Sequence, residues 1–326
     1  MLSYLIRRLA IMAPMMLAAT FLMFMIVSFS GDPLAEVRTM QPPPPPDVIE
    51  QMAKTLRLDQ PVLTRYWLWL TGVLTGDFGP SLRGMDIGAE LVQRIGVSLR
   101  LLALGLLIAF VMAILATIVG AIFQFSIADH ILSVIAVITI SMPVFWLAIL
   151  LKRGAIEINR TVGFRLLYTM GDGSGFAAGT TSQKLLLLVG VLSLPTLALA
   201  LQSFGTWSRY GRVALIEAMT SEYVKLARAK GLSETRVVLA HGLRTSLAPM
   251  LTVMTAGAAV ILGESVVTEQ VFQWRGMGDL LVSGIQNNDV YVVLAWLLVA
   301  GLLIMIFNLV ADLLYAILDP RIRYDQ

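Results

Sequence analysis

Residues Glu217 to Pro249 read EAMTSEYVKLARAKGLSETRVVLAHGLRTSLAP, and this charged stretch lies between two strongly apolar parts of the chain. Membrane proteins keep most of their polar connections short, so a long, basic and helix-forming segment between two spans needs a reason. The stretch predicts a pair of helices that forms a docking surface in the cytoplasm.

The composition predicts an all-α integral membrane protein. Of the 326 residues, 57% are hydrophobic and only 14% are charged. A water-soluble domain of this length could not carry that composition without large exposed apolar patches. Cysteine is absent, which excludes disulfides, thiol nucleophiles and thiolate metal sites in this chain.

Six segments are long enough to cross a hydrocarbon core of about 30 Å as helices, which takes about 20 residues each. Pro143 and Pro195 lie inside the third and fourth segments, where neighbouring helices are expected to accommodate them. The predicted spans are Leu9–Phe29, Val97–Phe123, Ile131–Leu151, Leu185–Phe204, Leu247–Gly263 with a few further residues, and Val290–Leu318.

The distribution of Lys and Arg predicts that both termini lie in the cytoplasm. With the N-terminus inside, one side holds Arg7, Arg8, the basic residues of the charged stretch, Arg321 and Arg323. The other side holds about as many basic residues, but they are more widely spaced and outnumbered by Asp and Glu. The first span resembles a signal sequence, but its length favours a retained membrane anchor.

The segments on the outer side are expected to include a small extracytoplasmic subdomain after the first span. Its helices are predicted at Asp47–Leu58 and at Val62–Leu74, the second amphipathic with Trp67 and Trp69 at interfacial depth. The second outer segment, Lys152–Lys184, is polar and Gly-rich and is expected to be a mobile loop.

The charged stretch itself predicts a helix, a tight turn and a second helix. Ala214–Lys230 contains neither Gly nor Pro, and Gly231 follows as a left-handed C-cap. Ser233 is placed as the N-cap of a second helix that begins with Glu234 and runs through Leu243. A DNA-reading motif would have this outline, but its position between spans argues against it. An amphipathic pair lying on anionic lipid stays open as an alternative.

These residues resemble the cytoplasmic coupling motif of bacterial ABC importer permeases, specifically the dipeptide, oligopeptide and nickel branch. The wider motif reads Glu-Ala-Ala, three residues, Gly, nine residues, Ile, one residue, Leu-Pro. Measured from Gly231, the chain keeps Ala227 and Leu243. It departs from the wider motif at Lys225, Leu226, His241 and Arg244, as the peptide branch does.

The resemblance extends over essentially the whole chain. The segments that carry it, besides the coupling motif, are Tyr4–Leu9, Gly31–Pro33, Leu58–Pro61, Gly76–Gly79, Phe272–Gly278 and Asn308–Arg323. According to this resemblance, residues 1–30 contain the first span and residues 31–96 form the outer subdomain. Residues 97–318 form the permease core, with coupling helices at about 212–245, and residues 319–326 form a tail.

The resemblance implies a pore subunit of an ATP-driven peptide importer in the bacterial inner membrane. The implied partners are a homologous second permease subunit, two ATPase subunits that bind ATP and Mg, and an extracytoplasmic substrate-binding protein. The contact zone for the ATPase is expected at Lys225, Ala227, Arg228, Lys230, Gly231, Leu232, Ser233 and Glu234. Nickel chelates or glutathione are alternative cargoes.

Nothing in the sequence predicts catalysis by this chain. It has no Gly-Lys dipeptide, so a Walker-type phosphate loop is absent, and neither His130 nor His241 has neighbours that complete a metal site. We therefore expect no enzyme activity, cofactor or metal here. An ion-coupled carrier is the rival class, but Asp312 is the one acidic residue within a predicted span core, and a single acid makes a poor proton relay.

Overall fold

The computed structural model describes residues 2–42, 44–171 and 181–318, and all regular secondary structure within them is helical. The chain divides into two compact units. Unit 1 comprises Met1–Ser98 and Arg275–Met305, and unit 2 comprises Leu99–Trp274 and Ile306–Gln326. The helices α5 and α14 each begin in unit 1 and end in unit 2.

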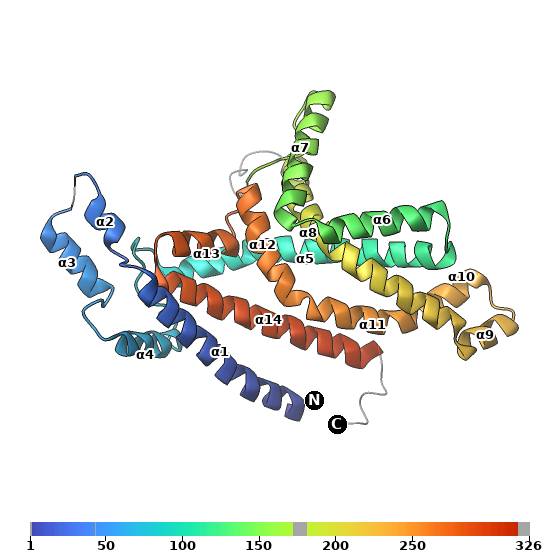
Figure 1. Ribbon diagram of the computed structural model, residues 1–326, viewed down its shortest axis with the longest axis horizontal. Helices are drawn as coiled ribbons and strands as arrows, with labels where there is room; N and C mark the ends of the chain where they lie inside the picture. The colour runs from blue at the N-terminus through green and yellow to red at the C-terminus, as the bar shows by residue number, and fades with distance from the viewer. Residues whose placement is uncertain (1, 43, 172–180, 319–326) are drawn as a thin grey trace. The chain divides into compact units, whose positions relative to one another are not determined.

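Unit 1 contains the first span and the helices that follow it (Figure 1). Its helices are α1 (Leu2–Ser30), α2 (Ala35–Thr39), α3 (Pro46–Thr55), α4 (Val62–Val73), α13 (Met277–Gln286) and the first parts of α5 (Ile87–Ile122) and α14 (Val290–Leu318). The predictions of helices at Asp47–Leu58 and Val62–Leu74 are confirmed by α3 and α4.

The core of unit 1 combines aliphatic side chains with a group of packed aromatic rings. The ring centroids of Phe24 and Tyr66 are 5.5 Å apart, and those of Tyr66 and Trp69 are 5.9 Å apart. Trp69 is 1% exposed whereas Trp67 is 64% exposed. The difference arises because Trp69 belongs to the apolar cluster that includes Phe24 of α1 and Tyr291 of α14. The interfacial depth of the two tryptophans stays a prediction.

Two polar clusters hold unit 1 together. The carboxylate of Asp289, just before α14, accepts hydrogen bonds from Ser81 Oγ and Leu82 N, both at 2.8 Å. Burial raises the pKa of Asp289, and these hydrogen bonds oppose the rise. Arg94 on α5 donates to Glu90 and to Asp279 of α13, each at 2.6 Å.

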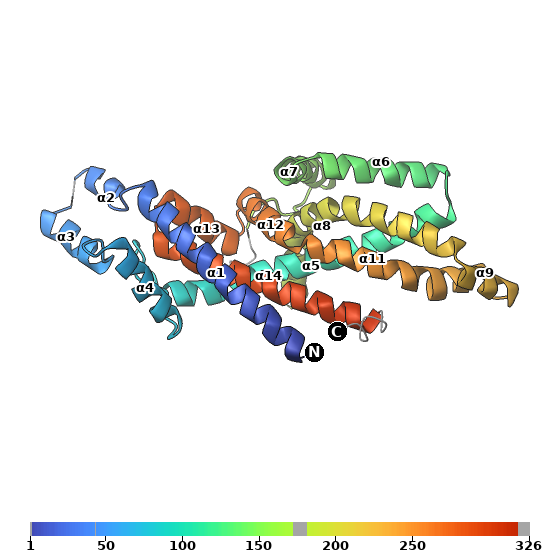
Figure 2. The same ribbon diagram turned by 60° about the horizontal axis from the view of Figure 1, so that its bottom comes forward.

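Unit 2 is a helical bundle that contains the charged stretch (Figure 2). Its elements are the second part of α5, α6 (Ile127–Ser141), α7 (Val144–Val162), α8 (Thr181–Thr220), α9 (Glu222–Ala229), α10 (Glu234–Arg236), the π-helix η1 (Val237–Gly242), α11 (Leu243–Ala256), α12 (Ala258–Phe272) and the end of α14.

The long helix α8 is the centre of unit 2, because α6, α7, α11 and α12 all pack against it. It is continuous through Pro195, as predicted, and extends well beyond the predicted end at Phe204. Close packing with α6 depends on Gly205. A Cβ atom there would lie 2.7 Å from the carbonyl oxygen of Ala136.

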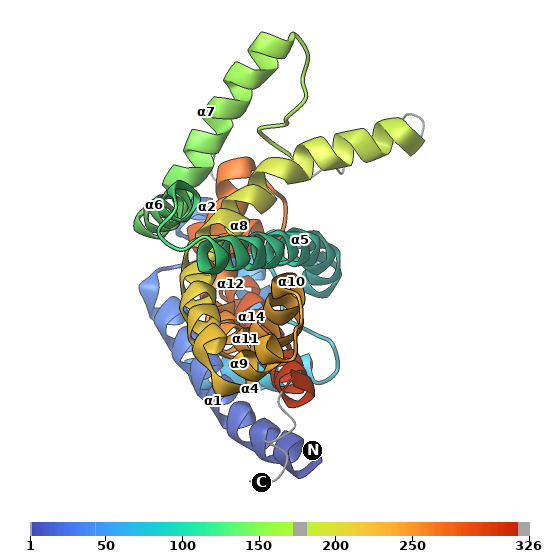
Figure 3. The ribbon, with the colours of Figure 1, turned by 90° about the vertical axis from the view of Figure 1, so that its right-hand side faces the viewer.

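The third predicted span, Ile131–Leu151, is not one helix. It is divided between α6 and α7, which are bent by 116° relative to each other, and Figure 3 shows α7 turning away from α6. Proline disfavours helical backbone in the residue before it, and Met142, which precedes Pro143, is extended with φ −92° and ψ 129°. The expectation that a continuous helix accommodates Pro143 is therefore wrong.

The bend makes α7 part of the outer segment that was predicted as a loop. Residues from Lys152 to Val162 are helical, which corrects that prediction for the first part of the segment. Lys152 Nζ donates a 2.8 Å hydrogen bond to the carbonyl oxygen of Val271 and lies 5.7 Å from the ring centroid of Phe272. These contacts attach α7 to the last turn of α12. Most of the Gly-rich part falls at 172–180, outside the described residues.

Within the part of the chain that the structure describes, five helices are long and apolar enough to cross a membrane, or six if the bent pair of α6 and α7 counts as one span. The fifth predicted span is wrong in its bounds, because the helix is interrupted at Gly257 and continues as α12 to Phe272. The cytoplasmic placement of both termini stays a prediction. The tail at 319–326 lies outside the described residues, as does the side chain of Asp312.

We expect Gly205→Ala to lower the stability of unit 2 by about 1–3 kcal/mol, because overpacking forces α6 and α8 apart. Gly154→Ala is the matched control, since a Cβ on that residue of α7 meets nothing within 4 Å. The control should be neutral or more stable by about 0.5–1 kcal/mol, the usual gain of Ala over Gly inside a helix. Thermal unfolding of both variants in the same detergent checks this. Equal melting temperatures for the two would contradict it.

Candidate functional site

The charged stretch begins where α8 ends. Ser221 breaks the helix with extended backbone at φ −69° and ψ 154°. Its carbonyl oxygen accepts hydrogen bonds from the N–H groups of Val224 (3.2 Å) and Lys225 (3.1 Å), which starts α9. The predicted single helix from Ala214 to Lys230 is therefore wrong, because it is divided at Ser221 into the end of α8 and the separate helix α9.

The turn after α9 is a Schellman motif. The N–H of Gly231 donates to Arg228 O at 2.9 Å, and the N–H of Leu232 donates to Ala227 O at 3.4 Å. Gly231 has φ +78°, so the predicted left-handed cap is confirmed. A Cβ at this position meets nothing within 4 Å in this chain, which leaves the space beside Gly231 open to a partner.

The second helix begins where it was predicted but continues differently. Ser233 is extended at the N-cap position, and its carbonyl oxygen accepts from Val237 N at 3.0 Å. Its side chain makes no capping hydrogen bond. After one turn, α10 becomes the π-helix η1, in which Gly242 packs against Leu215 and Met219 of α8.

A small apolar core holds the helix pair together. Val224 and Val237 are fully buried and Ala227 is 5% exposed, with Met219 and Leu232 packed against them. Ala227 and Leu232 belong to the predicted contact zone, but in the folded chain they support the pair from inside. The side chains that are available to a partner are therefore the exposed ones around them.

Ion pairs fix the exposed side of the turn. Arg228 donates to both carboxylate oxygens of Glu234, at 3.1 Å from Nε and 2.6 Å from Nη2. The hydrogen bond to Glu234 raises the pKa of Arg228, because it favours the charged form of the guanidinium. Lys225 pairs with Glu222 at 2.7 Å. Lys230, Gly231 and Ser233 are exposed.

Two exposed apolar side chains complete the surface of α9. Tyr223 is 43% exposed and Leu226 is 56% exposed, although Val224 and Ala227 of the same helix are buried. They are three residues apart, so they share one face of the helix. Both residues lie outside the predicted contact zone. In the sequence, Tyr223 and Leu226 could have been recognised as an apolar pair on a different face of the helix from Val224 and Ala227.

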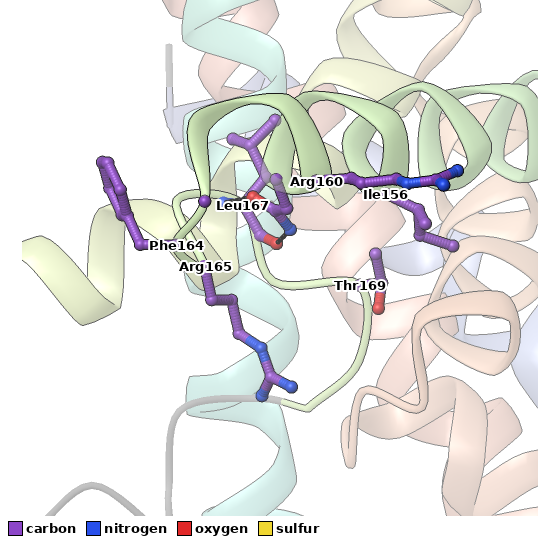
Figure 4. A pocket seen from close by; sticks show the side chains of 8 residues that line it. Ile156, Arg160, Phe164, Arg165, Leu167 and Thr169 are labelled. Carbon is purple, nitrogen blue, oxygen red and sulfur yellow. Dashed lines mark hydrogen bonds between the residues drawn. The ribbon is translucent and has the colours of Figure 1, made fainter.

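A second feature of unit 2 is an open hollow of about 500 Å³ at the far end of α7. Asn159 shapes it, because its side chain accepts from Leu166 N and Leu167 N and donates to Leu167 O. Figure 4 shows Arg160 extending from the helix and Arg165 from the loop. The guanidinium of Arg165 lies 5.6 Å from the ring centroid of Tyr168. The hollow therefore has a basic lining.

Among the described residues, no group of three or more His, Cys, Asp or Glu is placed to hold a metal ion. The site consists of a projecting helix and a basic hollow, and both are features suited to binding other proteins.

Two family descriptions match the chain. Residues 105–324 match "Binding-protein-dependent transport system inner membrane component", and residues 1–83 match the N-terminal region of such membrane components. The first match includes the whole of the charged stretch, together with the hollow.

Curated relatives match over almost the full length. The chain is 38% identical over 323 residues to the oligopeptide transport system permease protein OppB of Mycobacterium tuberculosis, covering 99% of each protein. It is 30% identical over 327 residues to the oligopeptide permease AppB of Bacillus subtilis and 33% identical over 326 residues to the glutathione permease GsiC of Escherichia coli, covering 99% of this chain and 100% of each relative. The chain therefore belongs to the family of inner-membrane components of binding-protein-dependent transport systems, the permease subunits of ABC importers.

Proposed function

We propose that this chain is one of two permease subunits of an ATP-driven importer of peptides, and that α9 is the element through which separate ATPase subunits act on it. The observation that carries the proposal is the exposed surface of α9 around Tyr223, Leu226 and Gly231, which projects from the end of α8. A projecting helix with apolar anchors fits a groove on a partner protein.

The helix pair has the mechanical properties that such a role needs. Arg228 and Glu234 pair across the turn, and Val224 and Val237 pack beneath it, so α9 and η1 form one small rigid body. This body is continuous with α8 on one side and with α11 on the other. A displacement of α9 by closing ATPase subunits would therefore move two spans at once.

The contact zone comprises Lys225, Arg228, Lys230, Gly231, Ser233 and Glu234 as exposed residues, with Ala227 and Leu232 supporting them. We add Tyr223 and Leu226 to this zone because they are exposed and apolar. ATP and Mg are bound by the partner ATPases in this proposal, because the chain contains no Gly-Lys dipeptide from which a Walker-type phosphate loop could be built.

The cargo is proposed to be a peptide. Relatives named as oligopeptide permeases match the chain over 99% of its length, which supports this choice. Glutathione is the second candidate, favoured by the 33% identity to a glutathione permease. The substrate-binding protein is proposed to dock on the outer side, with the basic hollow of Arg160 and Arg165 as part of its docking surface.

Gly231→Arg is expected to abolish uptake and transport-coupled ATP turnover while the chain still inserts. Arginine strains a backbone held at φ +78° and fills the space left for the partner. Gly84→Arg is the matched control, because Gly84 also has positive φ (+65°) and open space around it. Uptake and ATP hydrolysis by the full complex in proteoliposomes measure the effect. Normal uptake by Gly231→Arg would contradict the assignment of α9.

The complete importer, reconstituted with its binding protein, should accumulate labelled oligopeptides only when ATP is present on the ATPase side. Unlabelled oligopeptides should compete for this uptake more strongly than glutathione, since a binding site for an extended peptide uses more backbone groups than a tripeptide-sized cargo provides. If the importer took up glutathione but no oligopeptide, glutathione would replace peptides as the assigned cargo.

Replacing both Arg160 and Arg165 by Glu is expected to weaken docking of the binding protein, because charge reversal at an interface rim slows association. The measurement is ATP hydrolysis as a function of the concentration of loaded binding protein, which should need a higher concentration for half-maximal stimulation. Basal hydrolysis should not change. Arg153→Glu on the same helix lies outside the hollow and serves as the control. An unchanged concentration dependence for the double variant would exclude the hollow from docking.

A further inference from the structure

An ion pair joins α6 to α8 at the end of unit 2 that leads into α9. Arg212 donates to both oxygens of Asp129, at 2.7 Å from Nε to Oδ1 and 2.8 Å from Nη2 to Oδ2. The side chain of Asp129 is 5% exposed and that of Arg212 is 28% exposed. Two parallel hydrogen bonds between planar groups fix both the separation and the relative orientation of the two helices.

The same carboxylate also holds the turn between α5 and α6. Asp129 Oδ2 accepts a 3.0 Å hydrogen bond from the N–H of Phe125. Phe125 has φ +62°, a left-handed conformation that a residue with a large side chain rarely adopts. This backbone persists because Asp129 holds its N–H in place, so one side chain connects the α5–α6 turn to α8.

The third helix at this point, α5, is shaped to receive the pair. A Cβ atom at Gly120 would lie 3.1 Å from Arg212 Cδ and 3.2 Å from Asp129 Oδ1. The absence of a side chain at Gly120 therefore lets α5 approach the pair directly. The helices α5, α6 and α8 all meet at Asp129 and Arg212.

Stability alone gives a weak reason for such a pair. A largely buried ion pair costs desolvation energy, and apolar side chains of similar volume would hold the helices at least as well. Elsewhere α6 and α8 do pack without charges, as at Gly205 and Ala136. What an ion pair with two hydrogen bonds adds is a defined orientation at the place where α8 continues towards Ser221 and α9.

We propose that Asp129 and Arg212 are positioning residues for transport. They make the ends of α5, α6 and α8 move as one body with α9, so that a displacement of α9 reaches α6 and, through the bend at Pro143, α7. Without the pair, α8 would move with α9 while α6 lagged behind. This inference rests on the proposed function, because it assigns the path by which the ATPase displacement enters the bundle.

The test uses the complete importer in proteoliposomes and measures both ATP hydrolysis and peptide uptake. Asp129→Asn is nearly isosteric and retains an acceptor for Phe125 N, whereas Arg212→Lys keeps the charge but loses the planar two-bond geometry. Both variants should hydrolyse ATP in response to loaded binding protein. In both variants, peptide uptake per ATP hydrolysed should fall by about fivefold or more. Fivefold is the lower end of the change that coupling between two sites usually produces.

Asp279→Asn is the matched control. Asp279 also pairs with an arginine, Arg94 at 2.6 Å, but through a single hydrogen bond to a more exposed carboxylate, in unit 1 and without a connection to α9. This variant should keep the wild-type ratio of uptake to hydrolysis. A double variant, Asp129→Arg with Arg212→Asp, restores an ion pair with the two charges exchanged. It should recover part of the wild-type ratio of uptake to hydrolysis.

A second measurement separates positioning from folding. The chain has no cysteine, so Ala229→Cys at the exposed end of α9, outside the contact zone, and Ile158→Cys on α7 give two unique labelling sites within it, once cysteines in the partner subunits are replaced. The distance between the labels should change on ATP binding in a defined way in the wild type. In Asp129→Asn the distribution should become broad or lose its dependence on ATP.

The outcomes are distinguishable. A wild-type ratio of uptake to hydrolysis in Asp129→Asn and Arg212→Lys would overturn the positioning role and leave the proposed function intact. Loss of complex assembly or of thermal stability in both variants, with the ratio unchanged in the remaining complex, would also overturn it, because the pair would then be structural. Absence of ATP-dependent uptake by the wild-type complex would overturn the proposed function and this inference together.

Discussion

The structure depends on one constraint, which is that backbone N–H and C=O groups inside a lipid bilayer must be satisfied by the chain itself. Helices meet this requirement, and interruptions occur where the freed groups find other partners. At Gly257 the hydrogen bonds continue across the interruption, from Gly257 N to Val253 O and from Ile261 N to Gly257 O. The carbonyl oxygen of Ser221 accepts hydrogen bonds from the N–H groups of Val224 and Lys225 in α9. At both interruptions, the carbonyl oxygen of the residue at the break therefore still accepts a backbone hydrogen bond.

The same constraint bears on the length of α8. A helix of 40 residues is about 60 Å long at a rise of 1.5 Å per residue, roughly twice the thickness of a hydrocarbon core of about 30 Å. Part of α8 must then extend beyond the lipid. The bonded backbone keeps that extension stiff, and its packing against α6 and α11 decides which spans follow when its end is displaced.

Features with a local cause were predicted well from the sequence. The left-handed turn at Gly231 follows from the intrinsic freedom of glycine, and the helices α3 and α4 follow from the boundaries around Pro46 and Pro61. The apolar runs also identified most of the spans. Pro143 was misjudged because a proline inside an apolar run is compatible with either a continuous helix or a sharp bend, and tertiary packing decides between them.

Features that depend on distant residues could not be predicted. Asp129 and Arg212 are 83 residues apart in the chain, and no local pattern connects them. The exposure of Leu226 and the burial of Ala227 likewise depend on where η1 packs. A motif can mark the position of a docking element, but only the folded chain shows which of its side chains face outward.

The apolar core formed by Val224, Ala227 and Val237 has a consequence for assembly. Because α9 packs against its own chain, a partner that docks on it has little backbone to order, and preorganised elements lose less conformational entropy on binding. More of the contact free energy then remains available to the affinity of that contact.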